Sequence, residues 1–391
     1  MTDFATNPLR PATDAPAPAP VEETLGRLRP LLPRFGITRV ADVTGLDRIG
    51  IPVWCAIRPN SWSLAVSQGK GLTPEQAQVS AIMEAVELWH AERVELTTRW
   101  ERPDRLARGA TALDVRTFPD PDPGVCERRI PWVLGTDLVD GSRCWVPRDA
   151  VDCDDRIDPH GPRAAVQGGT NGLAAGAIPA QATAHALCEV LERHAVAGWE
   201  ELGEAERADR RVDLGTVEDP VNRELIALFG EAGVTPVVWD VGSTVGVPVF
   251  DCLLVEDDRL ALHPMPQVLG TGCHPRPEVA LTGALTEAAQ VRATIIAGAR
   301  DSIPRSRYEW YYDPHERRDV ASVLGDHPVR QFPIEAGARC STLEAEVDWL
   351  VSRTTDASGA RVAAVDLTKA TIGIPVVKVM AEGLRWAHAL Y

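Results

Sequence analysis

The chain lacks the sequence features of several common classes of protein. Its eight cysteines form no C-x-x-C pair and no zinc-binding spacing, so we expect reduced, mostly structural thiols. No apolar run approaches ~20 residues and no signal peptide is recognisable, so we expect a cytoplasmic protein without a membrane span. The nine histidines are scattered and suggest neither a Ser-His-Asp nor a Cys-His catalytic set.

Positive charge is also scarce in this sequence. There are 40 Lys and Arg residues against 56 Asp and Glu residues, and the formal net charge of −16 argues against nucleic-acid binding through phosphate contacts. An anionic ligand such as a nucleotide would need a cation near the acidic residues. The 391 residues, 45% of them hydrophobic, are enough for two domains or for one large domain made of repeated units.

One helical pattern occurs three times in the chain. The pattern P-x-x-A-x-x-x-A-x-x-E-x-x-[E/Q] begins at Pro74, Pro179 and Pro277, and the long offsets indicate a large internal repeat. Proline is favoured at the first helical position, so the pattern predicts helices near residues 74–93, 179–199 and 277–298.

Strand-like segments separate these predicted helices. This alternation predicts an α+β fold in which helices pack on a mixed β-sheet. Residues 1–20 are rich in Pro and Ala and have little to bury, so we expect a disordered tail there. The remainder, residues 21–391, is then expected to form a single domain of three strand–helix repeats.

Each copy of the pattern places a glutamate on its small, apolar stripe. The first glutamate lies seven residues past the first alanine and three past the second, on the face expected to meet the core. Carboxylates are rarely buried without a partner, so inward-facing carboxylates from separate helices suggest a multi-metal site. The three residues are Glu84, Glu189 and Glu287.

In two copies a second glutamate follows three residues later, on the same helix face. A single E-x-x-E is usually a solvated charge pair, but two pairs in one repeat frame favour a shared role. Hard oxygen ligands on two helices suit Mg²⁺, and no histidine shares these faces as zinc or di-iron sites would require. The predicted metal ligands are Glu84, Glu87, Glu189 and Glu192.

Two glycine-rich segments, residues 67–71 and 167–176, precede the first two helices. We predict turns whose backbone N–H groups can hold phosphate oxygens, although plain tight turns are an alternative and neither segment matches the Walker pattern. Lys70 could bind a phosphate or be a surface lysine. Arg193 and Arg292 could stabilise a transferring phosphoryl group, or could pair with glutamates of a neighbouring repeat.

Taken together, these motifs resemble the YcaO family over nearly the whole chain, from about residue 21 to residue 382. The matching stretches are GITRVADVTGLDRIGIPVW (36–54), SQGKG (67–71), SAIMEAVELWHAE (80–92), TNGLAAG (170–176), HALCEVLERHA (185–195), GALTEAAQVRATIIAGARD (283–301) and DLTKATIGIPVVKV (366–379). The phrases ITRVADVTGLDRIGIPV and IAGARD look most like the branch that works beside a TfuA-type partner.

The resemblance implies ATP- and Mg²⁺-dependent phosphorylation of a backbone amide oxygen in a precursor peptide. The product would be a thioamide, an azoline or an amidine, depending on the nucleophile, and the enzyme would be a cyclodehydratase or thioamide synthetase. It further implies a homodimer and a TfuA-like protein or sulfur donor as partner. The residues that match nucleotide-binding positions are Thr24, Lys70, Thr170, Asn171, Gln181, Arg193 and Arg292, of which the two arginines would be catalytic.

The chain also departs from the family pattern. Ala177-Ile178 stands where members often have Asn-Thr, Gln181 stands where the family pattern implies a ligand carboxylate, and His194 replaces a common Asp. The Pro-rich C-terminal tail of many azoline-forming members is absent, which favours a thioamide product. The alternative is a degenerate accessory protein that binds a peptide or a partner enzyme. An ordinary Mg²⁺-dependent phosphatase or kinase lacks a recognisable nucleophilic Asp motif here.

Overall fold

The structure is a computed structural model, and it describes residues 20–106, 110–156, 164–242, 246–256, 267–300, 303, 305–306, 328–359 and 361–385. Apart from Pro20, the tail expected at residues 1–20 lies outside the described residues. Among the described residues no helix is both long enough and apolar enough to cross a membrane. Each of the eight cysteines is a free thiol, as predicted.

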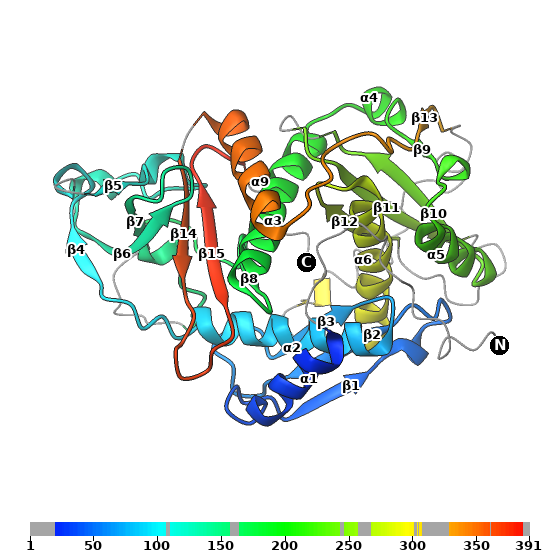
Figure 1. Cartoon of the computed structure of the whole chain (residues 1–391), viewed down its shortest axis with the longest axis horizontal. Helices are drawn as coiled ribbons and strands as arrows, with labels where there is room; N and C mark the ends of the chain where they lie inside the picture. The colour runs from blue at the N-terminus through cyan, green and yellow to red at the C-terminus, as the bar shows by residue number, and fades with distance from the viewer. Residues whose placement is uncertain are drawn as a thin grey trace.

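The first sheet is an antiparallel set of three strands in the order β1-β2-β3. It is covered by the first repeat helix, α2, against which the N-terminal helix α1 also lies (Figure 1). Pro74 takes the first position of α2, and the Thr73 hydroxyl caps it by accepting a hydrogen bond from the Gln76 N–H. The bounds are α1 Val21–Leu28, β1 Arg39–Asp42, β2 Val53–Ile57, β3 Val66–Lys70 and α2 Pro74–Ala91.

The second sheet has the same arrangement, with three antiparallel strands in the order β10-β11-β12. The third repeat helix, α6, lies along β12 and β11, and α5 packs beside α6 and β10 (Figure 1). The bounds are α5 Pro220–Glu231, β10 Val234–Asp240, β11 Val249–Glu256, β12 Val268–Cys273 and α6 Pro277–Ala297.

The largest sheet has seven strands, in the order β5-β7-β6-β14-β15-β8, with β4 paired to β6. The second repeat helix, α3, packs on β15 and β8, and α9 packs on α3. The short strand β8 precedes α3 in the chain, yet its neighbour β15 comes from the C-terminal end. The bounds are β4 Arg99–Glu101, β5 Thr111–Ala112, β6 Ile130–Asp137, β7 Arg143–Pro147, β8 Leu173–Ala175, α3 Pro179–Glu200, α9 Leu343–Ser358, β14 Val362–Asp366 and β15 Val376–Ala381.

Smaller elements connect these three sheets. Two short strands, β9 and β13, pair in parallel beside the second sheet, and helix α4 precedes β9. Together with the parallel pair β5–β7, they make the β-structure mixed, so the predicted α+β class is confirmed. The bounds are α4 Glu204–Ala208, β9 Val212–Asp213 and β13 Arg330–Gln331, with 3₁₀ turns at Arg29–Leu31, Thr44–Leu46, Pro103–Arg105, Val115–Thr117, Val125–Glu127, Arg148–Ala150 and Leu214–Thr216.

Strand glycines lie directly against the alanine stripes of the repeat helices. A Cβ added to Gly69 in β3 would lie 2.0 Å from the Ala81 nitrogen in α2, and one added to Gly270 in β12 would lie 2.1 Å from the Ala288 nitrogen in α6. Small residues on both sides therefore bring helix and strand backbones unusually close. The stripe alanines Ala77, Ala81, Ala182, Ala186, Ala280 and Ala284 are all buried, as the pattern predicts.

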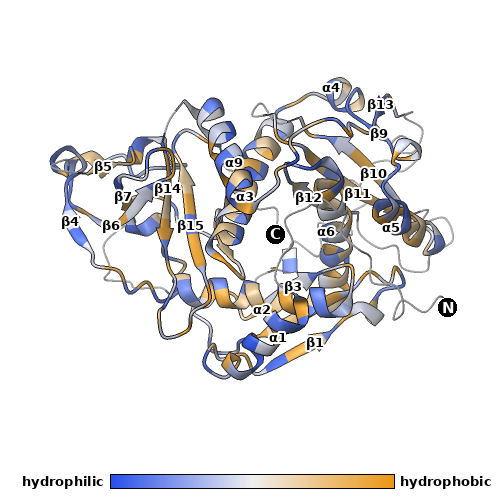
Figure 2. Ribbon diagram, in the orientation of Figure 1, coloured by the Kyte–Doolittle hydropathy of each residue, from blue (hydrophilic) through white to orange (hydrophobic). Residues whose placement is uncertain are grey.

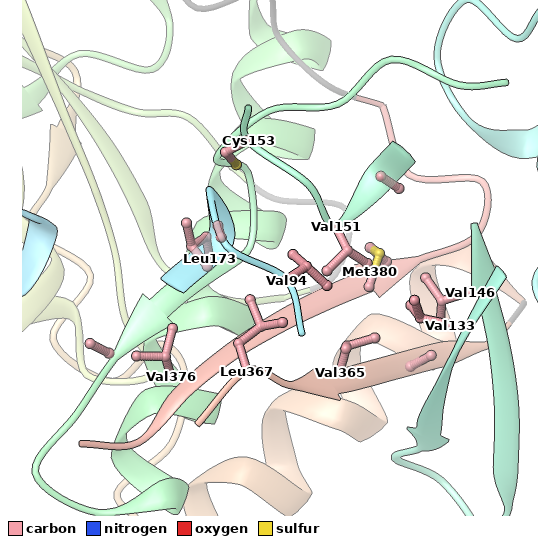
Figure 3. Packing of buried hydrophobic residues seen from close by; sticks show 14 of the residues in the cluster. Val94, Val133, Val146, Val151, Cys153, Leu173, Val365, Leu367, Val376 and Met380 are labelled. Carbon is pink, nitrogen blue, oxygen red and sulfur yellow. The ribbon is translucent and has the colours of Figure 1, made fainter. Parts of the chain in front are cut away.

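The core occupies the spaces between the helices and the sheets. Strands β11 and β15 consist mostly of hydrophobic residues (Figure 2). The largest cluster joins the first sheet and α2 to one face of the seven-stranded sheet, and Figure 3 shows Val365, Val376 and Met380 packed within it. A second cluster surrounds α6, and a third lies between α3, α9 and the other face of β15.

The three predicted helices are confirmed within two residues at each end. The turn predicted at residues 67–71 is wrong, because Val66–Lys70 form strand β3. Gly69 and Gly71 do not form a turn; their lack of a side chain allows the backbone at the end of β3 to lie directly against α2. The division into three strand–helix repeats stays a prediction.

Candidate functional site

The three repeat helices enclose one cavity of about 610 Å³ in the middle of the molecule. In Figure 1, α2 runs beneath this region and α3 and α6 stand on either side of it. Residues of α1, β3 and β8 complete the lining. The volume lies within the ~300–1,000 Å³ typical of small-ligand sites.

The first glutamate of each repeat helix faces this cavity and is held by a backbone N–H of the preceding segment. The donor–acceptor distances are 2.6 Å from Gln68 to Glu84, 3.2 Å from Gly172 to Glu189 and 3.5 Å from Thr271 to Glu287. Because β3, the turn before β8 and β12 each point a backbone N–H towards their helix, the carboxylates have fixed positions.

The second glutamate of α2 links two elements that are distant in sequence. Glu87 accepts a hydrogen bond from the Ala175 N–H of β8 at 2.7 Å. This bond ties α2 to the free edge of the seven-stranded sheet. It also places Glu87 in the cavity wall beside Glu84.

Burial and mutual repulsion disfavour the charged form of four of these carboxylates. Burial raises the pKa of Glu84 to about 7, against the opposing effects of the Gln68 N–H, Arg300 and Lys70. Burial likewise raises the pKa of Glu192 to about 7, in spite of Arg193. The pKa values of Glu87 and Glu189 are raised for the same reason.

The third repeat glutamate behaves differently because it has a cation. Lys70 of β3 forms an ion pair with Glu287 of α6. Burial alone would raise the pKa of Glu287, but the charges of Lys70 and Arg193 outweigh it, so the pKa of Glu287 is lowered. The first sheet and α6 are therefore joined by a salt bridge between two residues of the cavity wall.

Most of the residues predicted from the sequence line this cavity. The eight are Thr24, Lys70, Glu84, Glu87, Thr170, Gln181, Glu189 and Arg193. The Gln181 Oε1 accepts the Ala177 N–H at 2.8 Å, just as the Gln76 Oε1 accepts the Leu72 N–H at 2.9 Å one repeat earlier. Each of these glutamine oxygens thus holds the turn before its helix.

Three predicted residues do not line the cavity. Glu192 lies close enough that the charges of Glu287, Lys70 and Glu189 all act on it. The Asn171 amide is buried, and neither its oxygen nor its nitrogen has a hydrogen-bond partner among the described residues. The third, Arg292, lies in α6.

Of the two roles considered for Arg292, phosphate binding or ion pairing, its environment matches ion pairing. Its Nε donates to Asp47 at 2.9 Å and an Nη to Glu256 at 2.8 Å, with the side chain 3% exposed. These partners come from the loop before β2 and the end of β11. In this arrangement the guanidinium anchors α6 to these segments and does not face the cavity.

Two charged residues that line the cavity, Glu287 and Arg300, were not among the predicted metal ligands and nucleotide-binding residues. Glu287 shares the repeat frame of Glu84 and Glu189, so the repeat itself carried the signal for it. Arg300 lines the cavity, and its charge opposes the rise in the pKa of Glu84 that burial causes. Asp301 lies outside the described residues.

The arrangement suits a cation shared with an anionic ligand better than a closed metal site. Across the described ranges, no three carboxylate, imidazole or thiol groups meet closely enough to hold one ion. The glutamates instead surround the cavity, with Lys70, Arg193 and Arg300 among them. Mg²⁺ usually takes one or two carboxylates and completes its shell with water and phosphate oxygens, so this donor set fits Mg²⁺ with a phosphate ligand.

Sequence comparisons identify relatives over nearly the full length of the chain. A family model described as YcaO cyclodehydratase, ATP- and Mg²⁺-binding, matches residues 68–385. An uncharacterised protein in the tfuA 3′ region of Rhizobium leguminosarum bv. trifolii is 32% identical over 372 residues, covering 93% of this chain and 87% of the relative. An uncharacterised protein of Mycobacterium tuberculosis (strain CDC 1551 / Oshkosh) is 34% identical over 377 residues, covering 93% and 81%.

Solved structures share the fold. YcaO from Methanopyrus kandleri, solved with AMPPCP and Mg²⁺, superposes with a TM-score of 0.71 at 26% identity, covering 98% of this chain and 95% of that one. A heterocyclase solved with substrate and cofactor gives a TM-score of 0.77 at 19% identity, and the alignment spans 98% of this chain but 55% of the heterocyclase. The match of residues 68–385 to the family model, together with the three glutamates held by backbone N–H groups around one cavity, establishes that this chain belongs to the YcaO family.

Proposed function

We propose that this chain uses ATP and Mg²⁺ to phosphorylate a backbone amide oxygen of a peptide, and that the product is a thioamide or an azoline in a ribosomally made modified peptide. The observation that carries the proposal is the set of glutamates from α2, α3 and α6 around one cavity. The family description and the nucleotide-bound relative from Methanopyrus kandleri support the choice of ATP and Mg²⁺.

The wall of the cavity has the charges that a bound metal–nucleotide requires. Glu84, Glu87 and Glu189 supply oxygen ligands whose raised pKa values reflect carboxylates short of compensating charge, and a divalent cation would provide that charge. Glu192 lies near enough to join them. When bound, MgATP supplies an electrophilic phosphoryl group with much of its negative charge neutralised.

The remaining residues of the wall would orient the ligand. Arg193 and Lys70 are the cations from α3 and β3 that can bind phosphate oxygens, and Lys70 would exchange Glu287 for a phosphate. The Thr24 and Thr170 hydroxyls line the same cavity and can donate hydrogen bonds to phosphate. The Gln181 oxygen is engaged by the Ala177 N–H, which leaves its amide nitrogen as the group that can reach a ligand.

The choice between thioamide and azoline depends on the nucleophile. We favour a thioamide formed with external sulfide, because a relative that is 32% identical is named for its place in the tfuA 3′ region. A TfuA-like protein would then deliver or position the sulfur. An azoline would require a Cys, Ser or Thr side chain next to the activated amide in the peptide itself.

Mass spectrometry of a candidate precursor peptide, encoded beside this chain and co-expressed with it, tests the proposal. A thioamide exchanges one oxygen for sulfur, whereas an azoline loses one water, so the two products differ clearly in mass. The control is the Glu189→Gln variant, which should leave the peptide unmodified. Modification that persists in this variant would contradict the proposed ligand set.

Nucleotide binding separates this proposal from the alternative accessory role. An enzyme should bind AMPPCP in the presence of Mg²⁺ and turn over ATP when peptide is present. A protein that binds peptide or a partner enzyme but neither binds the analogue nor hydrolyses ATP would be an accessory member of the family.

A further inference from the structure

A lysine lies inside the hydrophobic core, one strand away from the cavity. Lys378 is in β15, in register with Leu173 of β8 and Val365 of β14, and it is 0% exposed. Because side chains alternate along a strand, it shares a face with Val376 and Met380, which pack in the largest apolar cluster (Figure 3). An ammonium group in such surroundings is costly unless it has a specific partner.

The partner of Lys378 is the turn that precedes β8. Its Nζ donates a hydrogen bond to the carbonyl oxygen of Gly169. The thiol of Cys153 donates to the same oxygen at 3.2 Å. Gly169 itself has a φ of 148°, a conformation that residues with side chains rarely adopt, so the turn needs outside support to keep this shape.

The supported turn carries groups that belong to the cavity. Thr170 lines the cavity directly. Two residues on, the Gly172 N–H holds Glu189, and the Gly172 carbonyl accepts the N–H of Val379 at 2.7 Å. Strand β15 therefore holds the turn at two points, once through its backbone and once through the lysine side chain.

The charge of the lysine also reaches the cavity. Burial lowers the pKa of Lys378, and the nearby Cys153 and Glu189 oppose that effect. Burial raises the pKa of Glu189. The charge of Arg193 and, to a smaller extent, the charge of Lys378 oppose this rise. A buried cation thus stands behind a carboxylate of the cavity wall, on the side away from the ligand space.

We propose that Lys378 is a positioning residue for nucleotide binding, which fixes residues 169–172 so that Thr170 faces the cavity and Gly172 orients Glu189. It does not line the cavity itself, so it would act through the turn. This inference rests on the proposed function, since the ligand it serves is MgATP. Its effect is on affinity, because an ordered turn loses no freedom when the ligand binds.

The test compares ligand affinity and stability in two variants of the same strand face. Lys378→Met keeps the length of the side chain and removes the charge and the hydrogen bond, while Cys153 still donates to the Gly169 oxygen. Val376→Ala is the matched control, because it shortens an apolar side chain of the same cluster. The side chain of Val376 makes no hydrogen bond, so this change removes none from the turn. The measurements are the Kd for AMPPCP with saturating Mg²⁺, by calorimetry, and the Tm without ligand.

We expect Lys378→Met to weaken AMPPCP binding by about tenfold, the effect of losing one hydrogen bond to a charged group. Its Tm should change little, because removing a buried charge offsets the lost bond. Val376→Ala should show the opposite pattern, with a lower Tm and wild-type affinity. Wild-type affinity in Lys378→Met would overturn the inference.

Two further outcomes are decided by other measurements. If Lys378→Met fails to fold, Cys153→Ala removes the second hydrogen bond to the same carbonyl; affinity weakened about threefold would support the inference, and unchanged affinity would overturn it. If the wild-type protein does not bind AMPPCP, the proposed function is wrong and the inference falls with it. An effect confined to the variants leaves the proposed function intact.

Discussion

Replacing Glu84 by Gln should make the metal-free protein more stable while removing its activity. The carboxylate lies in the cavity wall, where burial raises its pKa to about 7 from the ordinary value of 4.5. Above neutral pH it is charged in both the folded and the unfolded protein, so the fold bears the cost of an uncompensated charge. Glutamine is neutral, and its oxygen can still accept the Gln68 N–H that positions the glutamate.

The size of the effect follows from this pKa difference. The difference between a pKa of 4.5 and one of about 7 corresponds to about 3 kcal/mol. Allowing for partial solvent screening, we expect Glu84→Gln to raise the free energy of unfolding by roughly 1–3 kcal/mol. For a cooperative chain of this length that is a rise in Tm of roughly 1–4 °C. The stability gained by Glu84→Gln is absent at low pH, where Glu84 is protonated in both the folded and the unfolded protein. It grows as the pH rises from about 4.5 to about 7, because the unfolded protein then loses the Glu84 proton while the folded protein keeps it.

The assay is thermal melting of both proteins in EDTA at about pH 5 and about pH 8, followed by the same scans with Mg²⁺ and AMPPCP at the higher pH. Glu84→Gln should melt higher than wild type in EDTA at the higher pH, match it at the lower pH, and gain less from the ligands. Peptide-dependent ATP turnover should be lost. A variant that is less stable in EDTA at high pH and still turns over ATP would refute both the charge argument and the ligand assignment.

Other predictions concern the metal, the packing and the two arginines. Apparent Mg²⁺ affinity should rise as the pH increases through about 7, because Glu84 and Glu192, whose pKa values burial raises to about 7, must lose protons to bind the metal; a flat titration by calorimetry would contradict this. Gly69→Ala should lower the Tm by several degrees, because its Cβ would meet the Ala81 backbone, whereas Gly26→Ala, with nothing within 4 Å and a helical position, should raise stability by about 0.5–1 kcal/mol. Arg292→Met should cost about 3–5 kcal/mol of stability, because the buried Asp47 loses its ion pair with Arg292 and Glu256 keeps only Arg48, with little direct effect on AMPPCP affinity. Arg193→Met should weaken AMPPCP binding and change stability little, because Arg193 lines the cavity. Equal effects of the two variants on AMPPCP affinity would show that the roles assigned to the two arginines are wrong.

The helices and most of the site could be predicted because their signals are local. Proline at the first helical position, the alanine stripe and the glutamate three residues beyond it lie within one helix each, so a 3.6-residue period places them correctly. The third glutamate was visible in the same frame. Its salt bridge with Lys70 was not, because Lys70 lies in β3 of the first sheet and Glu287 in α6, which are far apart in the sequence.

The local conformation at residues 67–71 and the role of Arg292 could not be predicted, because both depend on segments that are distant in sequence. The glycines at 69 and 71 read as a turn in isolation, and only the nearby helix explains a strand with small residues. The family resemblance places Arg292 at the nucleotide, with an ion pair as the alternative. Its guanidinium turns instead to Asp47 and Glu256, whose position no local pattern could give.

The sequence by itself determined which helices form and which faces bear carboxylates, since periodicity and capping act over a few residues. Tertiary structure decided how these faces meet: β8, from the middle of the chain, pairs with β15 from its end, and that pairing brings Lys378 and the Gly169 turn behind Glu189. A carboxylate becomes a ligand when backbone N–H groups and opposing charges fix its position, and in this protein those groups come from segments far apart along the chain.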